Sequence, residues 1–292
     1  MAMTIVENHL LSVTGGIDTH RDFHVSAAID PNGGVLGVET FETTTGGHRR
    51  LVAWLAAFGD IDLVGVEGTG SYGAGIARHL TAKGIRVVEV DRPNRQARHR
   101  AGKTDAIDAI AAARAALTGT ATGIPKTRTG PIEAIRVLTV ARRSAASEWV
   151  VILNQMRHLC FTAPDEFRRR FSELSPIMLV RTCAALKPRR SDEDLVRFTT
   201  LSTLRELGRR GLFLREQTRR LDAQMKPLIN QIAPELLGVY GVGYHVAATL
   251  LIAAGDNPHR IRSEAAWAHL CGTAPIPASS GKIQRHRLNR GG

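Results

Sequence analysis

Apolar and polar positions alternate along the first third of the chain in a pattern that predicts strands before helices. Short apolar runs, bounded by Gly, Pro and polar residues, predict strands at 14–20, 22–30, 35–43, 62–68 and 85–90. Apolar residues at helical spacing predict helices at 46–59, 72–84 and 103–117. The turn signal PNGG joins the second and third strands, so the opening strands are expected to form an antiparallel hairpin or meander.

The order of these elements indicates the fold class. Antiparallel strands come first, and helical crossovers then join strands that are expected to be parallel. This is the order of a ribonuclease H-like domain, in which helices flank a mixed sheet. We therefore predict an α/β domain of this type over residues 1–125.

The middle of the chain is predicted to be helical. After Pro131 the segment to Cys160 contains neither Gly nor Pro, and it is longer than most globular helices. Ser191, followed by three acids in a row, is expected to cap a helix, and a second long helix is predicted over 201–232. Two such helices usually pack on each other or on a partner subunit. We therefore expect a coiled-coil-like arm over residues 126–233.

The last segment, residues 234–292, changes character again. The run LLGVYGVGYHVAATLLIAAGD predicts a helix end, a Gly-rich turn and an apolar helix. Another helix, a loop rich in Pro, Ser and Gly, and a basic tail follow. This pattern predicts a third, mostly α-helical domain.

Charge divides the chain unevenly. The net charge is +12, yet residues up to Ile110 hold 11 Lys and Arg against 13 Asp and Glu, whereas the remainder holds 28 against 14. A strongly basic body favours a polyanionic partner, most often nucleic acid. The alternative is a generally basic protein with solvated arginine faces.

Other features of composition indicate the compartment. No uninterrupted apolar run reaches membrane-spanning length, and the N-terminus lacks the pattern of a signal peptide. The three cysteines are widely spaced, so they form neither a zinc cluster nor a disulfide framework. We therefore expect a cytoplasmic protein that has no membrane partner.

Four carboxylates stand where the predicted elements of the first domain begin or end. Asp18 ends the first strand, Glu67 ends the fourth, and Asp105 and Asp108 open the helix after the fifth. Residues three apart share one helix face. In a ribonuclease H-like sheet the first and fourth strands are neighbours, and their carboxyl ends would meet at one edge. Four acids so close would repel one another unless cations neutralised them. Hard divalent ions prefer oxygen ligands, so two Mg²⁺ or Mn²⁺ ions about 4 Å apart are the expected cofactors, without an organic cofactor.

Each acid also has an ordinary explanation. Asp105 and Asp108 could simply offset the helix dipole, Asp18 could end a strand in a turn, and Glu67 could be a solvated acid. The set as a whole, with each member at a strand end or a helix start, favours the metal site over these explanations.

The segments GIDTHRDFHVSAAID, VGVEGTGSYGAGIARHL and RQARHRAGKTDAIDA resemble motifs of the Asp-Glu-Asp-Asp (DEDD) transposases of bacterial insertion sequences. The N-terminal domain of that family is similar to the RuvC Holliday-junction resolvase. GVGYHVAATLLIAAGD and CGTAPIPASSGKIQRHRLNRGG are similar to its C-terminal transposase domain. The resemblance spans almost the whole chain and maps the RuvC-like carboxylates to Asp18, Glu67, Asp105 and Asp108.

The resemblance further implies a serine nucleophile within PIPASSGK. Ser279 and Ser280 both fit, and Ser280 is preferred because it immediately precedes Gly281. The alternative is that this segment is only a flexible loop. Family members ordinarily continue with further helices beyond this motif, so we expect the C-terminal domain to be truncated here.

Three sequence features predict contacts with nucleic acid. A basic run directly before the aspartate pair is expected to track phosphates, through Arg92, Arg95, Arg98, Arg100 and Lys103. Lys282, Arg285 and Arg287 lie close in sequence to the serines. Gly241 and Gly243 open a helix, where backbone N–H groups can meet a phosphate, as in helix-hairpin-helix proteins. The alternatives are a solvated loop and a simple tight turn.

The resemblance implies a transposase or site-specific recombinase of the bridge-RNA-guided family, which is related to pilin-gene DNA invertases. Its expected partners are donor and target DNA, a structured guide RNA and a second copy of the chain through the coiled-coil region, with a tetramer in the synaptic complex. Two other functions remain open: a metal-dependent junction nuclease without a serine step, and a non-catalytic nucleic-acid-binding protein. A sugar-kinase-like ATPase would need two halves of the ribonuclease H type, and the helical second half argues against it.

Overall fold

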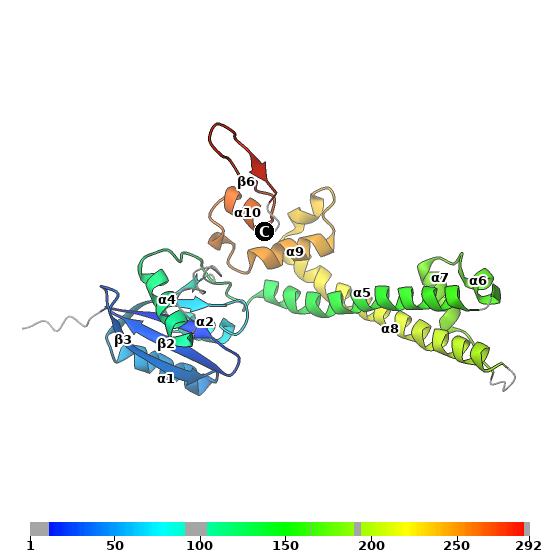
Figure 1. Cartoon of the computed structure of the whole chain (residues 1–292), viewed down its shortest axis with the longest axis horizontal. Helices are drawn as coiled ribbons and strands as arrows, with labels where there is room; N and C mark the ends of the chain where they lie inside the picture. The colour runs from blue at the N-terminus through cyan, green and yellow to red at the C-terminus, as the bar shows by residue number, and fades with distance from the viewer. Residues whose placement is uncertain (1–11, 91–103, 164, 190–193, 289–292) are drawn as a thin grey trace, which may run out of the picture. The chain divides into compact units, whose positions relative to one another are not determined.

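Figure 1 shows the computed structural model of the chain, which describes residues 12–90, 104–163, 165–189 and 194–288. The chain divides into two compact units. The first unit consists of Met1–Thr129 together with Ala254–Gly292, and the second of Gly130–Ala253. None of the described helices is both long and apolar enough to cross a membrane.

A five-stranded mixed sheet forms the centre of the first unit, in the order β3-β2-β1-β4-β5. β1 is antiparallel to β2 and parallel to β4; β2 is antiparallel to β3, and β4 is parallel to β5. The strands are β1 (Ser12–Thr19), β2 (Phe23–Ile29), β3 (Val35–Glu42), β4 (Asp60–Glu67) and β5 (Arg86–Val90). The flanking helices are α1 (Thr45–Ala56), α2 (Ala74–Ala82) and α4 (Asp105–Leu117). The predicted mixed sheet flanked by helices is confirmed, and it agrees with a ribonuclease H-like domain.

Helices α1 and α2 cover one face of this sheet. Their buried side chains, among them Leu51, Leu55 and Ile76, pack with strand residues such as Ile17 and Val66. This cluster is the main apolar core of the first unit.

Helix α4 covers the other face at very short range (Figure 1). A Cβ atom at Gly16 of β1 would lie 2.2 Å from the carbonyl oxygen of Ala109, and one at Gly65 of β4 would lie 2.5 Å from that of Ala112. Gly16 and Gly65 pair across the two parallel strands. Glycines on the strands and alanines on the helix therefore let the helix backbone rest directly on the sheet. This contact explains why α4 is rich in alanine.

The second unit contains two long helices that pack against each other. It comprises α5 (Pro131–Thr162), α6 (Asp165–Phe171), α7 (Pro176–Ala184), α8 (Leu195–Ile232), the 3-10 helix η1 (Pro234–Gly238) and α9 (Tyr244–Ala254). Buried residues of α5 and α8, such as Ile152 and Leu204, share one cluster with α6 and α7. A second cluster joins both long helices to α9 through residues such as Ile135, Ile229 and Ala248. The two long predicted helices thus bury their apolar stripes on each other, whereas a coiled-coil dimer remains a prediction.

The second long helix begins earlier than the sequence pattern predicts. α8 begins at Leu195 rather than Leu201, and its cap is Asp194, whose side chain accepts a hydrogen bond from the Arg197 N–H at 2.9 Å. Ser191, which is predicted to cap a helical segment ahead of residue 201, lies outside the described residues. Aspartate and serine are equally good caps, so cap propensity alone does not distinguish a helix that starts after Ser191 from one that starts after Asp194.

The C-terminal segment of the first unit contains η2 (Pro258–Arg260), α10 (Glu264–Leu270) and a small antiparallel pair, β6 (Ile276–Pro277) and β7 (His286–Arg287). The Asn257 side-chain amide donates to the carbonyl of Pro125 at 2.9 Å, and Arg260 Nε donates to that of Ile124 at 3.1 Å. These bonds tie the start of the C-terminal segment to the chain that follows α4. The predicted division into domains at 1–125, 126–233 and 234–292 stays a prediction.

Candidate active site

The register of the central strands places Asp18 and Glu67 side by side in the sheet. Gly16 pairs with Gly65 and Ile17 with Val66, so Asp18 and Glu67 occupy the next position of each parallel strand. Side chains on one strand alternate between faces, so both acids lie on the face that α4 covers. Each is only 7% exposed, and carboxylates are rarely buried so deeply in proteins.

The end of these two strands is held by a hydrogen bond between them. The Thr19 hydroxyl donates to the backbone carbonyl of Glu67 at 2.8 Å. The chain then turns at Gly68, whose φ of 67° is one that L side chains rarely adopt. The hydrogen bond from Thr19 and the turn at Gly68 therefore hold the backbone in place at the residues that follow Asp18 and Glu67.

The first turn of α4 brings the other two acids to the same edge of the sheet. Thr104 caps the helix by accepting a hydrogen bond from the Ile107 N–H at 3.3 Å. Asp105 and Asp108 follow in the first turn. An acid that served only the helix dipole could remain in solvent, but Asp108 is 9% exposed and lies close enough to Asp18 to act on its ionisation.

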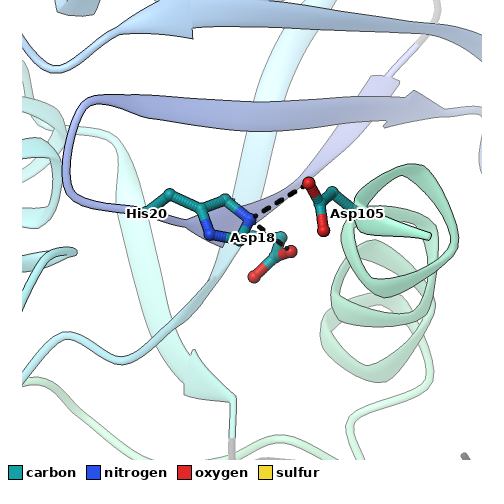
Figure 2. Close-up of side chains that lie close together, drawn as sticks. All are labelled: Asp18, His20 and Asp105. Carbon is teal, nitrogen blue, oxygen red and sulfur yellow. Dashed lines mark hydrogen bonds and ion pairs between the residues drawn. The ribbon is translucent and has the colours of Figure 1, made fainter. Parts of the chain in front are cut away.

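A histidine that the sequence interpretation did not include joins this site. Figure 2 shows the ring of His20 with one edge pointing toward both Asp18 and Asp105. Its Nε2 lies 3.1 Å from Oδ2 of Asp18 and 3.4 Å from Oδ2 of Asp105. One ligand atom of each of these residues lies within 4.8 Å of those of the other two. The sequence offered one signal for His20, which is its spacing. His20 stands two positions after Asp18, and side chains two positions apart lie on the same face of a strand.

Burial raises the pKa of Asp18 above its usual value of 3.8. His20 opposes this shift, while the nearby carboxylates of Asp108 and Asp105 add to it. The site therefore concentrates negative charge in a place that disfavours it. A bound divalent cation would remove this conflict, and the carboxylate oxygens are the ligands that such an ion prefers. The donor set thus fits a divalent metal.

The four predicted carboxylates are not equivalent in the structure. In the part of the chain that the structure describes, the closely spaced group consists of Asp18, His20 and Asp105. Asp108 lies beside Asp18 but outside that group, and Glu67 reaches the site by strand register. The structure therefore brings all four acids to one edge of the sheet and clusters two of them tightly.

The two candidate serines differ in what their hydroxyl groups do. Ser279 Oγ accepts a hydrogen bond from the Arg285 N–H at 3.2 Å and donates to the Arg285 carbonyl at 3.4 Å. Ser280 pairs with Ile283 through backbone groups, and its hydroxyl has no hydrogen-bond partner among the described residues. The following Gly281 has a φ of 57°. Ser280 therefore presents an available hydroxyl at the tip of an exposed hairpin, together with the exposed side chains of Lys282, Arg285 and Arg287.

The remaining predicted contacts with nucleic acid lie elsewhere. Gly241 has a φ of 82°, and the carbonyl of Gly243 accepts the first hydrogen bond of α9, from Ala247. Both lie in the second unit, and apart from their chain neighbours no described residue would come within 4 Å of a Cβ at either position. The basic run of Arg92, Arg95, Arg98, Arg100 and Lys103 lies outside the described residues.

The mixed sheet flanked by helices is compatible with a ribonuclease H-like fold, and its acidic edge is a candidate metal centre. Comparison with protein families is more specific. Residues 15–161 match a family described as transposase, the DEDD transposases of IS110 type, and residues 233–292 match the transposase IS116/IS110/IS902 family. The chain belongs to the IS110 family of transposases, enzymes that cut and rejoin DNA. A comparison with curated proteins found no match.

Proposed function

We propose that the chain cuts and rejoins DNA strands with a divalent metal centre held by Asp18, Glu67, Asp105 and Asp108, and with Ser280 as the nucleophile. The observation that carries the metal centre is the convergence of buried Asp18 with Asp105 and Asp108 at one edge of the sheet. Membership of a transposase family supplies the substrate, which is DNA.

A bound ion would polarise a scissile phosphate and stabilise the oxygen that leaves it. The protein's own part is to hold the carboxylates in place through the α4 cap and the strand register. The Ser280 hydroxyl would form a bond to phosphorus while one sugar oxygen leaves with a proton, which links the DNA to the protein. Lys282, Arg285 and Arg287 would offset the charge that develops on the phosphate.

The family resemblance extends this proposal to the assembly. We propose donor and target DNA as substrates, a structured guide RNA as the source of sequence specificity, and a homodimer that pairs into a tetramer when two DNAs are joined. Exposed apolar residues on α5, Val137 and Val140 among them, are available for contact between copies.

The first test measures metal binding. Titration calorimetry of the full chain with Mg²⁺ and Mn²⁺, with and without DNA, is compared with the Asp105→Asn/Asp108→Asn variant. We expect binding to the wild-type chain and its loss in that variant. The matched control, Asp60→Asn/Asp62→Asn, removes two exposed acids from the opposite end of β4 and should bind normally. Equal binding by all three proteins would mean that Asp105 and Asp108 only offset the helix dipole.

A second test separates the serine mechanism from a simple nuclease. The chain is incubated with Mn²⁺, DNA that carries its own gene with flanking sequence, and RNA transcribed from those flanks. We expect a protein–DNA adduct that survives denaturation, and its loss in Ser280→Ala but not in Ser279→Ala. Metal-dependent cleavage that Ser280→Ala leaves unchanged would favour a nuclease without a serine step.

A further inference from the structure

His20 is held in place by its own surroundings rather than by the acids alone. Its backbone N–H donates to the Phe23 carbonyl at 3.1 Å, in the tight turn between β1 and β2. Its ring lies 4.8 Å from the Phe23 ring, centroid to centroid, at an interplanar angle of 34°. The side chain is 30% exposed, so the ring sits at the mouth of the site while Asp18 lies deeper. The imidazole is thus oriented toward the carboxylates before any ion arrives.

The distances around Nε2 fit metal ligation. Ligands about 2.1 Å from an octahedral ion lie about 3 Å apart when they occupy adjacent positions. The separations of 3.1 Å to Asp18 and 3.4 Å to Asp105 are close to that spacing. Nε2 can therefore occupy a position next to either carboxylate oxygen around one ion, and the three ligand atoms lie within 4.8 Å of one another.

We propose that His20 is a nitrogen ligand of the metal centre and makes the site prefer Mn²⁺ over Mg²⁺. The inference rests on the proposed metal centre and adds a ligand to it. Mn²⁺ is a transition-metal ion and accepts an imidazole nitrogen beside carboxylate oxygens, whereas Mg²⁺ prefers an all-oxygen shell with several waters. A site of four carboxylates would bind either ion, whereas a site that also contains His20 would bind Mn²⁺ more tightly than Mg²⁺.

The test uses the full chain with Mn²⁺ alone. Pulsed electron paramagnetic resonance detects the coupling between Mn²⁺ and a directly bound ¹⁴N nucleus. We expect this coupling in the wild-type protein and in His158→Gln, which alters an exposed histidine of α5, and its loss in His20→Gln. Calorimetry should show that His20→Gln weakens Mn²⁺ binding by at least about tenfold, the loss typical of even an outer-shell partner. Mg²⁺ binding should change much less.

The possible results separate this inference from the metal centre on which it rests. Mn²⁺ binding that depends on Asp18 and Asp105 but shows no nitrogen coupling would overturn the role of His20 and keep the centre. Tighter Mn²⁺ binding by His20→Gln would show that His20 occupies the ion's place in the empty site, which also overturns it. The absence of Mn²⁺ binding in every protein would overturn both. Circular dichroism of each variant establishes that it is folded.

Discussion

At the scale of single residues, burial decides which titratable groups change their chemistry. Asp18 is buried beside other carboxylates and opposite His20, whereas Asp22 lies in the adjacent turn with its side chain in solvent. The two aspartates are of the same type and only four positions apart in the chain. What separates them is the sheet, because Asp18 faces α4 and loses water that Asp22 keeps.

The same principle acts on His24, from which we predict a dependence of stability on pH. Its ring is fully buried, stacks on His48 with centroids 5.6 Å apart, and has no hydrogen-bond partner for either nitrogen among the described residues. Burial lowers its pKa from 6.5 to about 4. Between these values the unfolded chain binds a proton that the folded chain does not. The contribution of neutral His24 to the free energy of unfolding is therefore fully present above about pH 6.5. It decreases toward pH 4, and about 2 kcal/mol is lost by pH 5.

Chemical denaturation at pH 7 and pH 5 measures this loss. His24→Phe, which keeps an aromatic ring but cannot bind a proton, should lose less stability over that interval than the wild type. His158→Phe, at an exposed position, should behave as the wild type does. Equal losses in His24→Phe and the wild type would contradict the prediction.

At the scale of elements, the contact between α4 and the sheet positions the site. Gly16 and Gly65 pair across β1 and β4, and the alanines of α4 lie directly above them. Two positions farther along each strand stand Asp18 and Glu67. The close approach that the glycines allow therefore sets how near the first turn of α4, with Asp105 and Asp108, comes to the other two acids.

We predict that Gly16→Ala destabilises the first unit and weakens metal binding. The new methyl group would lie 2.2 Å from backbone atoms of Ala109 and Ala113, which cannot move away as a flexible side chain can. Such overpacking costs about 3 kcal/mol, measured by urea denaturation. Gly46→Ala in α1 is the control, because its nearest neighbours lie 3.7 Å away or more. It should be neutral or stabilising by up to about 1 kcal/mol. Equal effects of the two changes would argue against the close packing.

At the scale of the whole molecule, the carboxylates of the candidate site and the excess of basic residues lie in different parts of the sequence. The acidic site lies in the segment whose net charge is slightly negative, whereas the basic excess begins after Ile110. Within the first unit, the basic hairpin that carries Ser280 returns from the far end of the chain to the same compact unit as the acids. Binding of a polyanion is thus expected to depend on residues far in sequence from the carboxylates.

This arrangement predicts how DNA affinity depends on salt. Each phosphate contact contributes about 0.9 to the slope of log affinity against log salt concentration. Replacement of Lys282, Arg285 and Arg287 by Ala should therefore lower the slope by about 2 to 3. Fluorescence anisotropy of a labelled duplex, over a range of NaCl concentrations, measures it. Removal of the exposed charges of Arg49, Arg78 and Lys83, which lie on or next to α1 and α2, is the matched control and should leave the slope unchanged. An unchanged slope in the hairpin variant would exclude the hairpin from phosphate binding.

The order of the elements and the positions of the four carboxylates within them can be predicted from local patterns of residues. Period-two and helical patterns are local, so they identify strands, helices and the acids at their ends without knowledge of any distant contact. The strand register, the contact of α4 with Gly16 and Gly65, and the convergence of His20 with Asp18 and Asp105 were decided only by the tertiary structure. The sequence already favoured Ser280 because it precedes Gly281, but the difference between the two hydroxyl groups depended on the hairpin, where hydrogen bonds with Arg285 occupy the hydroxyl of Ser279. Each of these depends on atoms that the fold brings together from separate elements, which a local pattern cannot encode.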